Sequence, residues 1–159
     1  MSYRVYVITA SDSGFAGARE DVSGPVAEEM LKEAGFSPVG YALLPDERML
    51  LADRMREICD KNEADLIVTT GGTGFSARDC MPEATADVSE RAVPGIPEAM
   101  RWYSLQITPR AMLSRAAAGI RGNTLIVNLP GSPKAVRENL GFILPSLDHA
   151  IQMMHGGGH

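Results

Sequence analysis

The chain has 159 residues, of which 45% are hydrophobic and 22% are charged, a composition typical of one globular domain with a full-sized core. Its net charge of −5 would repel a phosphate backbone, which argues against non-specific nucleic-acid binding. Cys59 and Cys80 have a spacing that suits neither a zinc knuckle nor a redox pair. Because we find neither a signal-peptide pattern nor a membrane-spanning run, we expect a cytoplasmic protein with two free thiols.

The first seventy residues alternate between strand patterns and helix patterns. Runs of β-branched and aromatic residues predict strands, and apolar residues three and four apart predict helices. We expect Ser23 or Gly24 to cap the first helix, and Gly35 and Asn62 to end the two helices. The alternation favours a parallel sheet with helices on both faces. The predicted elements are a strand over 3–10, a helix over 24–34, a strand over 38–44, a helix over 49–61 and a strand over 66–70.

A glycine-rich loop follows the third strand. The glycines of Gly71-Gly72-Thr73-Gly74 have no Cβ, so the backbone can take φ > 0 and turn its N–H groups toward an anion, while Thr73 adds a hydroxyl. Arg78-Asp79 then places a cation beside a carboxylate, and Pro82-Glu83 starts a helix. The motif is neither a Walker loop nor a dinucleotide fingerprint, and it also occurs in ordinary tight turns, so both interpretations stay open.

Two further polar loops follow predicted strands. The first is Ser11-Asp12-Ser13-Gly14, for which turn chemistry is the favoured interpretation when the loop is taken alone. The second is Pro45-Asp46-Glu47. Ligands of open α/β sheets collect at the carboxyl ends of the strands, so the convergence of these loops with the glycine loop strengthens a ligand-binding role for all three.

The second half of the chain is predicted to hold four helices and a hairpin. Trp102 and Tyr103 lie on one of the helices, and we expect their rings in packing or in a subunit contact. The last strand leads into Gly131-Ser132-Pro133-Lys134, where Pro133 suits a first helical turn and Lys134 either neutralises a phosphate or is simply solvated. The predicted elements are helices over 82–89 and 97–105, a short helix from Thr108-Pro109 to 114, a hairpin of 116–120 with 124–128, and a helix over 135–154 interrupted at Pro145.

These elements give one domain over residues 1–154, with residues 155–159 as a flexible tail. The predicted fold class is α/β, a three-layer α/β/α sandwich with a mostly parallel sheet and an antiparallel hairpin. We find no internal repeat and no zinc-site pattern.

Ordered motifs along nearly the whole chain resemble one known family. They are Thr69-Thr70-Gly71-Gly72-Thr73-Gly74, Arg78-Asp79, Pro82-Glu83-Ala84-Thr85, Val93-Pro94-Gly95, Ala111-Met112-Leu113-Ser114-Arg115, Gly119-Ile120-Arg121-Gly122 and Asn128-Leu129-Pro130-Gly131-Ser132-Pro133-Lys134. Together they resemble the MogA/MoaB family of molybdenum cofactor biosynthesis proteins, which includes the G domain of gephyrin. The resemblance implies an α/β/α fold, usually trimeric, that binds molybdopterin.

In enzymatic members, the resemblance further implies transfer of the adenylyl group of ATP to the terminal phosphate of molybdopterin, with Mg²⁺ required and pyrophosphate released. It marks Asp46 and Asp79 as the catalytic and metal-binding acids. The substrate-binding residues that it implies are Ser11, Asp12, Ser13, Gly71, Gly72, Thr73, Gly74, Glu83, Asn128, Gly131, Ser132, Pro133 and Lys134. A metal-insertion protein of the same pathway is a further expected partner.

Met81 departs from the family pattern, because related chains usually have Thr or Ser there, and the helix after Asp79 is therefore expected to lack a side-chain cap. Two alternatives to the enzyme remain. One is a non-catalytic molybdopterin carrier or assembly protein of the MoaB type, and the other is a nucleotide-binding fold of unrelated purpose. Loss of an acid would favour the carrier, and this chain has both acids.

Overall fold

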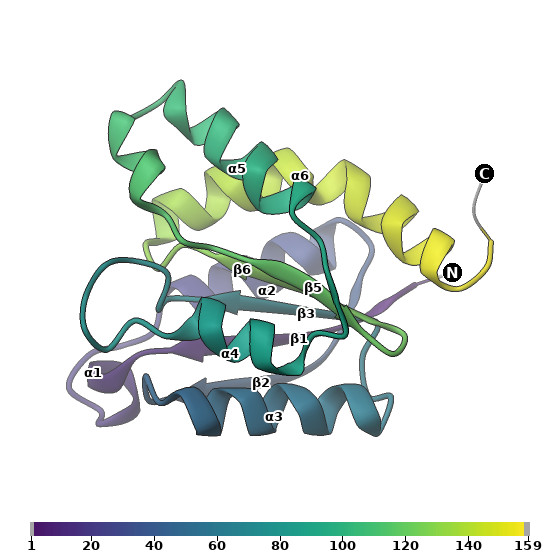
Figure 1. Cartoon of the computed structure of the whole chain (residues 1–159), viewed down its shortest axis with the longest axis horizontal. Coiled ribbons are helices and arrows are strands. Elements are labelled where there is room, and N and C mark those ends of the chain that lie inside the picture. Colours follow the sequence, from purple (N-terminus) through teal and green to yellow (C-terminus); the bar gives the residue numbers. More distant parts are fainter. Residues whose placement is uncertain (1, 158–159) are drawn as a thin grey trace.

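A six-stranded mixed sheet runs through the middle of the molecule in the computed structural model, which describes residues 2–157 (Figure 1). The strand order is β2-β1-β3-β6-β5-β4. The first four of these strands are parallel, β5 pairs antiparallel with β6, and β4 pairs antiparallel with β5. The strands are β1 (Arg4–Ala10), β2 (Ser37–Leu44), β3 (Leu66–Thr70), β4 (Arg91–Ala92), β5 (Ala118–Arg121) and β6 (Thr124–Leu129). The predicted parallel sheet with an antiparallel hairpin is confirmed.

Helices cover both faces of this sheet, which confirms the predicted three-layer fold (Figure 1). One face carries α2 (Ser23–Glu33), α5 (Gly95–Leu105) and α6 (Pro133–Met154), and the other carries α3 (Arg48–Asp60) and α4 (Met81–Val88). Two short elements complete the structure, α1 (Asp12–Phe15) and the 3₁₀ helix η1 (Pro109–Leu113).

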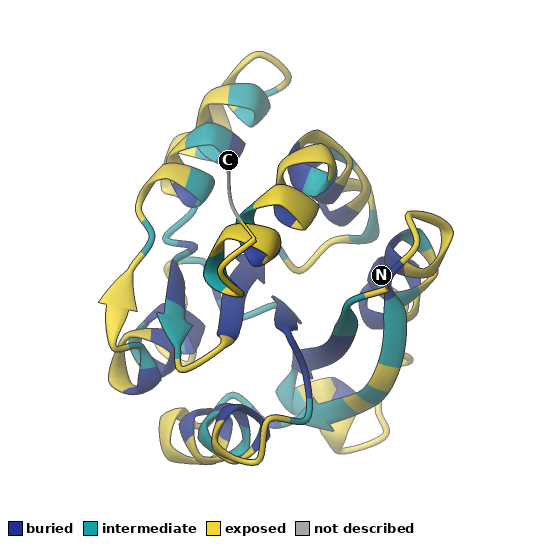
Figure 2. Ribbon diagram, turned by 90° about the vertical axis from the view of Figure 1, so that its right-hand side faces the viewer, coloured by how far each residue is buried: buried dark blue, intermediate teal, exposed yellow. Residues whose placement is uncertain are grey.

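Each central strand contributes to two separate cores. Val5 and Val7 pack toward α2 and α6, whereas Tyr6 and Ile8 pack toward α3 and α4, as the two-residue period of a strand requires. β3 and β6 are buried along their whole length, and Figure 2 shows the same burial between helices with exposed outer faces. This explains why these strands have continuous apolar runs rather than alternating ones.

Four local predictions need correction. The loop at Ser11 contains the helical turn α1, and Arg91 and Ala92, between the helices predicted over 82–89 and 97–105, form the short strand β4. Neither Ser23 nor Gly24 caps α2: the N-cap is Val22, and the Gly24 N–H donates to Asp21 Oδ1 at 3.2 Å.

The fourth correction concerns α6, which runs through Pro145 without a break. Proline removes one backbone donor and crowds the carbonyl four residues earlier, which here belongs to Gly141. The buried side chains of Ile143, Leu147 and Ile151 hold both halves of α6 on the same core, and this packing outweighs the local cost.

Several end signals are confirmed. Asn62 has φ +52° and Gly35 has φ +98°, as expected for residues that end helices.

Cys59 and Cys80 are free thiols, as predicted. The expected tail starts at His155, but this ring packs edge-on against Tyr3 at a centroid distance of 5.7 Å, and residues 158–159 lie outside the described part. None of the described helices is long and apolar enough to cross a membrane.

Candidate active site

The carboxyl ends of the four parallel strands bring the predicted ligand loops together. Thr9 of β1 is in register with Thr70 of β3, which is in register with Leu129 of β6. The Ser11 N–H donates to the Leu44 carbonyl at 2.9 Å and joins the loop after β1 to the end of β2. The expected convergence of the loops at 11–14, 45–47 and 71–79 is therefore confirmed.

The glycine loop uses its missing side chains in different ways. Gly71 and Gly72 have φ +85° and +73°, a conformation that favours glycine, whereas Gly74 is not in this region, contrary to expectation. A Cβ on Gly71 would collide with the Ala10 carbonyl oxygen. A Cβ on Gly74 would lie 2.9 Å from Asp79 Oδ2. Position 71 therefore requires a glycine, because of both its positive φ and the nearby Ala10 carbonyl. At position 74 the missing side chain leaves room for the Asp79 carboxylate.

Asp12 and Asp46 bind each other's backbone. The Asp12 N–H donates to Asp46 Oδ2 at 3.0 Å, and the Asp46 N–H donates to Asp12 Oδ1 at 2.9 Å. Arg78 donates to both carboxylate oxygens of Asp12 at 3.0 Å, and this pair lowers the pKa of Asp12, with the Asp46 backbone adding to the effect. Arg78 is therefore paired with Asp12, not with its sequence neighbour Asp79.

Asp46 forms no ion pair with any residue that the structure describes, and Arg78 pairs with Asp12 and Glu47 instead. The Oδ1 of Asp46 is buried and has no hydrogen-bond partner among the described residues. Burial raises the pKa of Asp46 above its usual range, and the charges of Asp12 and Asp79 add to this rise. A buried carboxylate oxygen without a partner is costly, which makes it a candidate ligand for a cation.

Asp79 lies next to Gly74, the last glycine of the loop. Its Oδ2 accepts a hydrogen bond from the Ser76 N–H at 2.9 Å, and its own N–H donates to the Ser76 carbonyl at 3.0 Å. A Cβ on Gly72 would lie 3.3 Å from Asp46 Oδ1, just as one on Gly74 would approach Asp79. The two predicted acids thus border the same short stretch of backbone.

A polar cavity of about 420 Å³ opens beside Gly71. Its walls include Ser11 and the segment from Gly131 to Pro133, as predicted, together with Asp21 and Ser23, which the sequence analysis did not select. Several hydroxyls here already have structural tasks. Ser11 Oγ caps α1 by accepting from the Gly14 N–H at 3.0 Å, and Ser132 Oγ caps α6 by accepting from the Ala135 N–H at 3.2 Å. The Ser23 hydroxyl instead donates to the Gly131 carbonyl at 2.5 Å. Ser11 Oγ also lies 3.4 Å from the exposed Ser13.

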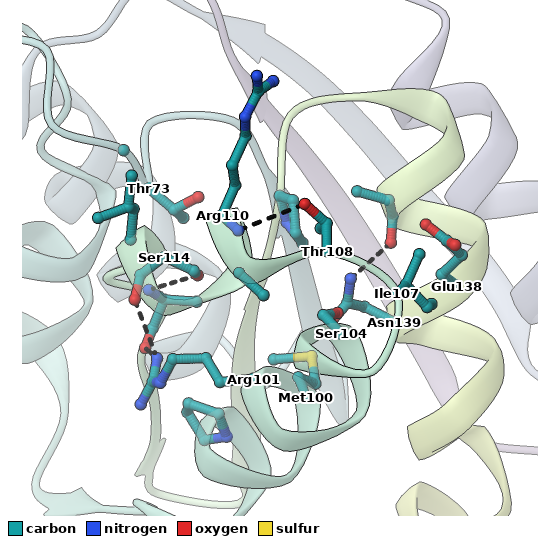
Figure 3. Close-up of a pocket in the computed structure, with 17 residues that line it drawn as sticks. Thr73, Met100, Arg101, Ser104, Ile107, Thr108, Arg110, Ser114, Glu138 and Asn139 are labelled. Carbon is teal, nitrogen blue, oxygen red and sulfur yellow. Dashed lines mark hydrogen bonds between the residues drawn. The ribbon is translucent and has the colours of Figure 1, made fainter.

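A second cavity, of about 300 Å³, opens on the other side of the glycine run, beside Thr73 and Gly74 (Figure 3). It lies between the glycine loop, α5, η1 and the first turns of α6, and much of its lining is apolar. Figure 3 shows Thr73 and Ser114 on one side and Asn139 and Glu138 on the other. The sequence analysis did not predict this cavity. The one part of its wall that the sequence indicates is the helix start at Thr108-Pro109. Thr108 caps η1 there by accepting from the Arg110 N–H at 3.3 Å.

Six of the predicted substrate-binding residues line neither cavity: Asp12, Ser13, Gly72, Glu83, Asn128 and Lys134. Asn128 is fully buried, and its amide donates to Thr69 of β3 and Thr85 of α4 while accepting from the N–H of Ala117, the residue before β5. Glu83 forms an ion pair with Arg115 at 2.6 Å. Lys134 is exposed at the start of α6. The side chains of Asn128 and Glu83 are thus engaged within the protein in this structure, and their binding roles stay predictions.

Met81 is the first residue of α4, and its side chain is fully buried in the core beneath the site. The N-cap is Cys80, whose side chain makes no capping hydrogen bond, so α4 starts without a side-chain cap, as expected. The Met81 N–H instead donates to the Gly72 carbonyl at 3.1 Å. The helix start is thereby joined directly to the glycine loop.

Comparison with known proteins agrees with this geometry. A family model described as a probable molybdopterin binding domain matches residues 6–149. The molybdopterin adenylyltransferase of Helicobacter pylori is 43% identical over 152 residues, which cover 94% of this chain and 86% of that protein. Gephyrin of Dictyostelium discoideum is 42% identical over 161 residues, which cover 95% of this chain and 22% of gephyrin.

Solved structures give the same result. The MoaB protein of Thermus thermophilus superposes with a TM-score of 0.92 at 46% identity, and 98% of each chain is covered. A MogA structure superposes with a TM-score of 0.89 at 35% identity, covering 95% of this chain and 99% of that one. The chain belongs to the molybdopterin-binding family of MogA- and MoaB-like molybdenum cofactor biosynthesis proteins.

Proposed function

We propose that this protein is a molybdopterin adenylyltransferase that transfers AMP from ATP to the terminal phosphate of molybdopterin in a Mg²⁺-dependent reaction. The proposal draws on the relatives that bear this activity as their name and cover most of this chain. The observation that carries it here is the buried Oδ1 of Asp46, which has no partner among the described residues and lies beside a glycine loop whose backbone has positive φ at Gly71 and Gly72. A bound cation would compensate this buried oxygen, and this supports a metal-binding role for Asp46.

The residues present fit a magnesium ion. Asp46 and Asp79 are hard oxygen ligands on either side of the same backbone stretch, and Asp46 has a free oxygen. Within residues 2–157, no cluster of three or more histidine, cysteine or carboxylate side chains would hold a metal by itself. Mg²⁺ usually binds through one or two carboxylates, water and substrate phosphates, so two acids suffice. When bound, the ion neutralises charge on the reacting phosphates.

The chain's own groups supply position and charge. We assign the backbone N–H groups of the glycine loop to hold a phosphate, and Asp46 and Asp79 to hold the metal. In the reaction an oxygen of the pterin phosphate forms a bond to the α-phosphorus of ATP, and the bond to the β-phosphate breaks, so pyrophosphate leaves with the electron pair. The nucleophile is already ionised at neutral pH, so no base is required from the protein.

The two cavities support a reaction with two substrates. The polar cavity borders Gly71 and the apolar one borders Thr73 and Gly74, so two ligands bound in them would meet at the glycine run. We propose that ATP and molybdopterin occupy these two cavities, one on each side.

The alternative is a member that binds molybdopterin without catalysis, as the MoaB-like neighbours leave open. The deciding experiment incubates the protein with molybdopterin, ATP and Mg²⁺ and measures adenylylated pterin and pyrophosphate. We expect both products, and neither when Mg²⁺ is chelated. Binding of molybdopterin without either product would establish the carrier.

We also propose a homo-oligomer, in line with the trimer of the family. Trp102 is 61% exposed, and Tyr103 and Phe142 stack at 4.5 Å beside it, where α5 meets α6. Exposed aromatic side chains of this size are typical of interfaces. Light scattering at micromolar concentration checks this, because a monomer would contradict it. A metal-insertion protein of the same pathway is the proposed consumer of the product.

A further inference from the structure

We propose that Arg115 is a positioning residue that fixes the loop between Gly74 and Asp79, and that Glu83 holds its guanidinium in place. The catalytic part of this inference rests on the proposed adenylyl transfer. The arginine belongs to the Ala111 to Arg115 motif, to which the mechanism above gives no task.

The guanidinium binds both ends of one loop. Arg115 Nε donates to the Gly74 carbonyl at 2.8 Å, and Nη2 donates to the Asp79 carbonyl at 2.9 Å. The Arg115 backbone N–H also donates to the Thr73 carbonyl at 2.8 Å. A single side chain therefore sets the distance between the end of the glycine run and the acid that follows it.

Glu83 fixes the other side of the same guanidinium. Its carboxylate accepts from Nη1 at 2.6 Å and from Nη2 at 3.2 Å. Both side chains are about one third exposed, and exposed ion pairs contribute little to stability, on the order of 0–1 kcal/mol. The value of this pair is therefore geometric: it ties the loop to the first turn of α4, where Glu83 lies.

The loop has few other constraints. Residues 75–78 are exposed, and Phe75 is 69% exposed. Apart from the turn between Ser76 and Asp79, its side-chain attachments among the described residues are the Arg78 pair with Asp12 and a longer contact of Arg78 with Glu47 at 3.9 Å. Arg78 holds the outer side of the loop and Arg115 the inner side. Loss of Arg115 would leave the Asp79 backbone free to shift, and a shift of about 1 Å in a positioned group costs on the order of a hundredfold in rate.

The test compares Arg115→Lys with Arg121→Lys. Lysine keeps the charge but cannot reach several acceptors with a fixed fork. Arg121 is a matched control at the opposite end of α4: it donates to both oxygens of Asp60 at 2.9 and 3.1 Å and to the Val88 carbonyl at 3.1 Å. The readouts are kcat and KM for adenylyl transfer and amide hydrogen exchange of residues 74–79.

We expect Arg115→Lys to lower kcat by about ten- to a hundredfold with KM changed less than about threefold, and to speed exchange in the loop at least about tenfold. Glu83→Gln should give a smaller change of the same kind, and Arg121→Lys should change neither readout. Unchanged loop exchange in Arg115→Lys overturns the proposal. Faster exchange with wild-type kcat overturns the catalytic part. If the wild-type protein forms no product, the proposed function fails, and the exchange comparison still decides whether Arg115 fixes the loop.

Discussion

Two aspartates, one at the amino ends of the parallel strands and one at their carboxyl ends, differ in whether their carboxylate oxygens are paired. Asp65, just before β3 at the amino edge, accepts hydrogen bonds from the Arg4 N–H at 2.8 Å and from its guanidinium at 3.0 and 3.3 Å. Asp46, just after β2 at the carboxyl edge, has a buried oxygen without a partner. Burial raises the pKa of Asp65, but the bonds and charge of Arg4 outweigh it and the net shift is downward, whereas the pKa of Asp46 is raised.

The space around the backbone also differs between the amino and carboxyl ends of the strands. Gly35 and Gly71 both have positive φ, but a Cβ on Gly35 would meet nothing within 4 Å, whereas one on Gly71 would meet the Ala10 carbonyl. At the amino ends of the strands the Asp65 carboxylate is thus fully paired, whereas at the carboxyl ends one buried oxygen of Asp46 has no partner among the described residues. Buried ionisable groups with perturbed pKa values are typical of functional sites, where stability is reduced in favour of binding.

The largest difference should be in activity. Asp46→Asn and Asp79→Asn each remove one charge without a change in shape, so we expect turnover to fall at least about a hundredfold, the scale for loss of one strong electrostatic stabiliser. Molybdopterin binding should persist. Asp65→Asn makes the same change at the other edge and should leave turnover within about threefold of wild type. Single-turnover adenylylation by the folded variants measures this, and equal losses at both edges would contradict the comparison.

The two glycines allow a second test. Gly35→Ala has only the cost of a positive φ, about 1 kcal/mol, while Gly71→Ala adds a collision with backbone and should cost at least about 2 kcal/mol. Gly71→Ala should also weaken phosphate-ligand binding, and Gly35→Ala should not. Urea unfolding and ATP titration measure both effects. Equal stability of the two variants would show that the loop accommodates the methyl group.

Asp65→Asn should lower the free energy of unfolding by about 1–2 kcal/mol at pH 7, because Arg4 loses a charged partner. Since folding lowers the pKa of Asp65, its stabilisation is present above the unfolded pKa and is lost as the pH falls through the folded pKa. The difference in the free energy of unfolding between wild type and variant should therefore vanish below about pH 4. A gap independent of pH would indicate lost packing rather than lost charge.

Asp46→Asn should have the opposite and smallest effect, an increase of less than about 1 kcal/mol at pH 7 without ligand. Folding raises the pKa of Asp46, so its favourable contribution is present below the unfolded pKa and is lost as the pH rises through the folded pKa. The free energy of unfolding of the variant should therefore increase relative to that of wild type as the pH rises from about 4 to 7. Unfolding curves at several pH values measure it, and a less stable variant would show that Asp46 is a structural residue.

The sequence by itself determined the layers and most of the elements, because strand and helix periods and the glycine stops are local properties. Leu66 to Thr70 were assigned as a buried strand from their composition and are one. It also determined which loops meet, since parallel strands place their carboxyl ends at one edge. Pro145 shows the limit of local rules: a predicted helix break is overridden by the core contacts of Ile143 and Leu147.

Only the tertiary structure decided the partners of the charged groups, because these lie far apart in sequence. Arg78 binds Asp12, 66 positions away, and Arg115 binds Glu83, 32 positions away. Neither pairing follows from composition or period. The same holds for the apolar cavity beside Thr73, which exists because α5, η1 and α6 pack around the glycine loop. A local pattern fixes which side chains a segment offers, whereas burial and charge pairing depend on what the fold brings next to them.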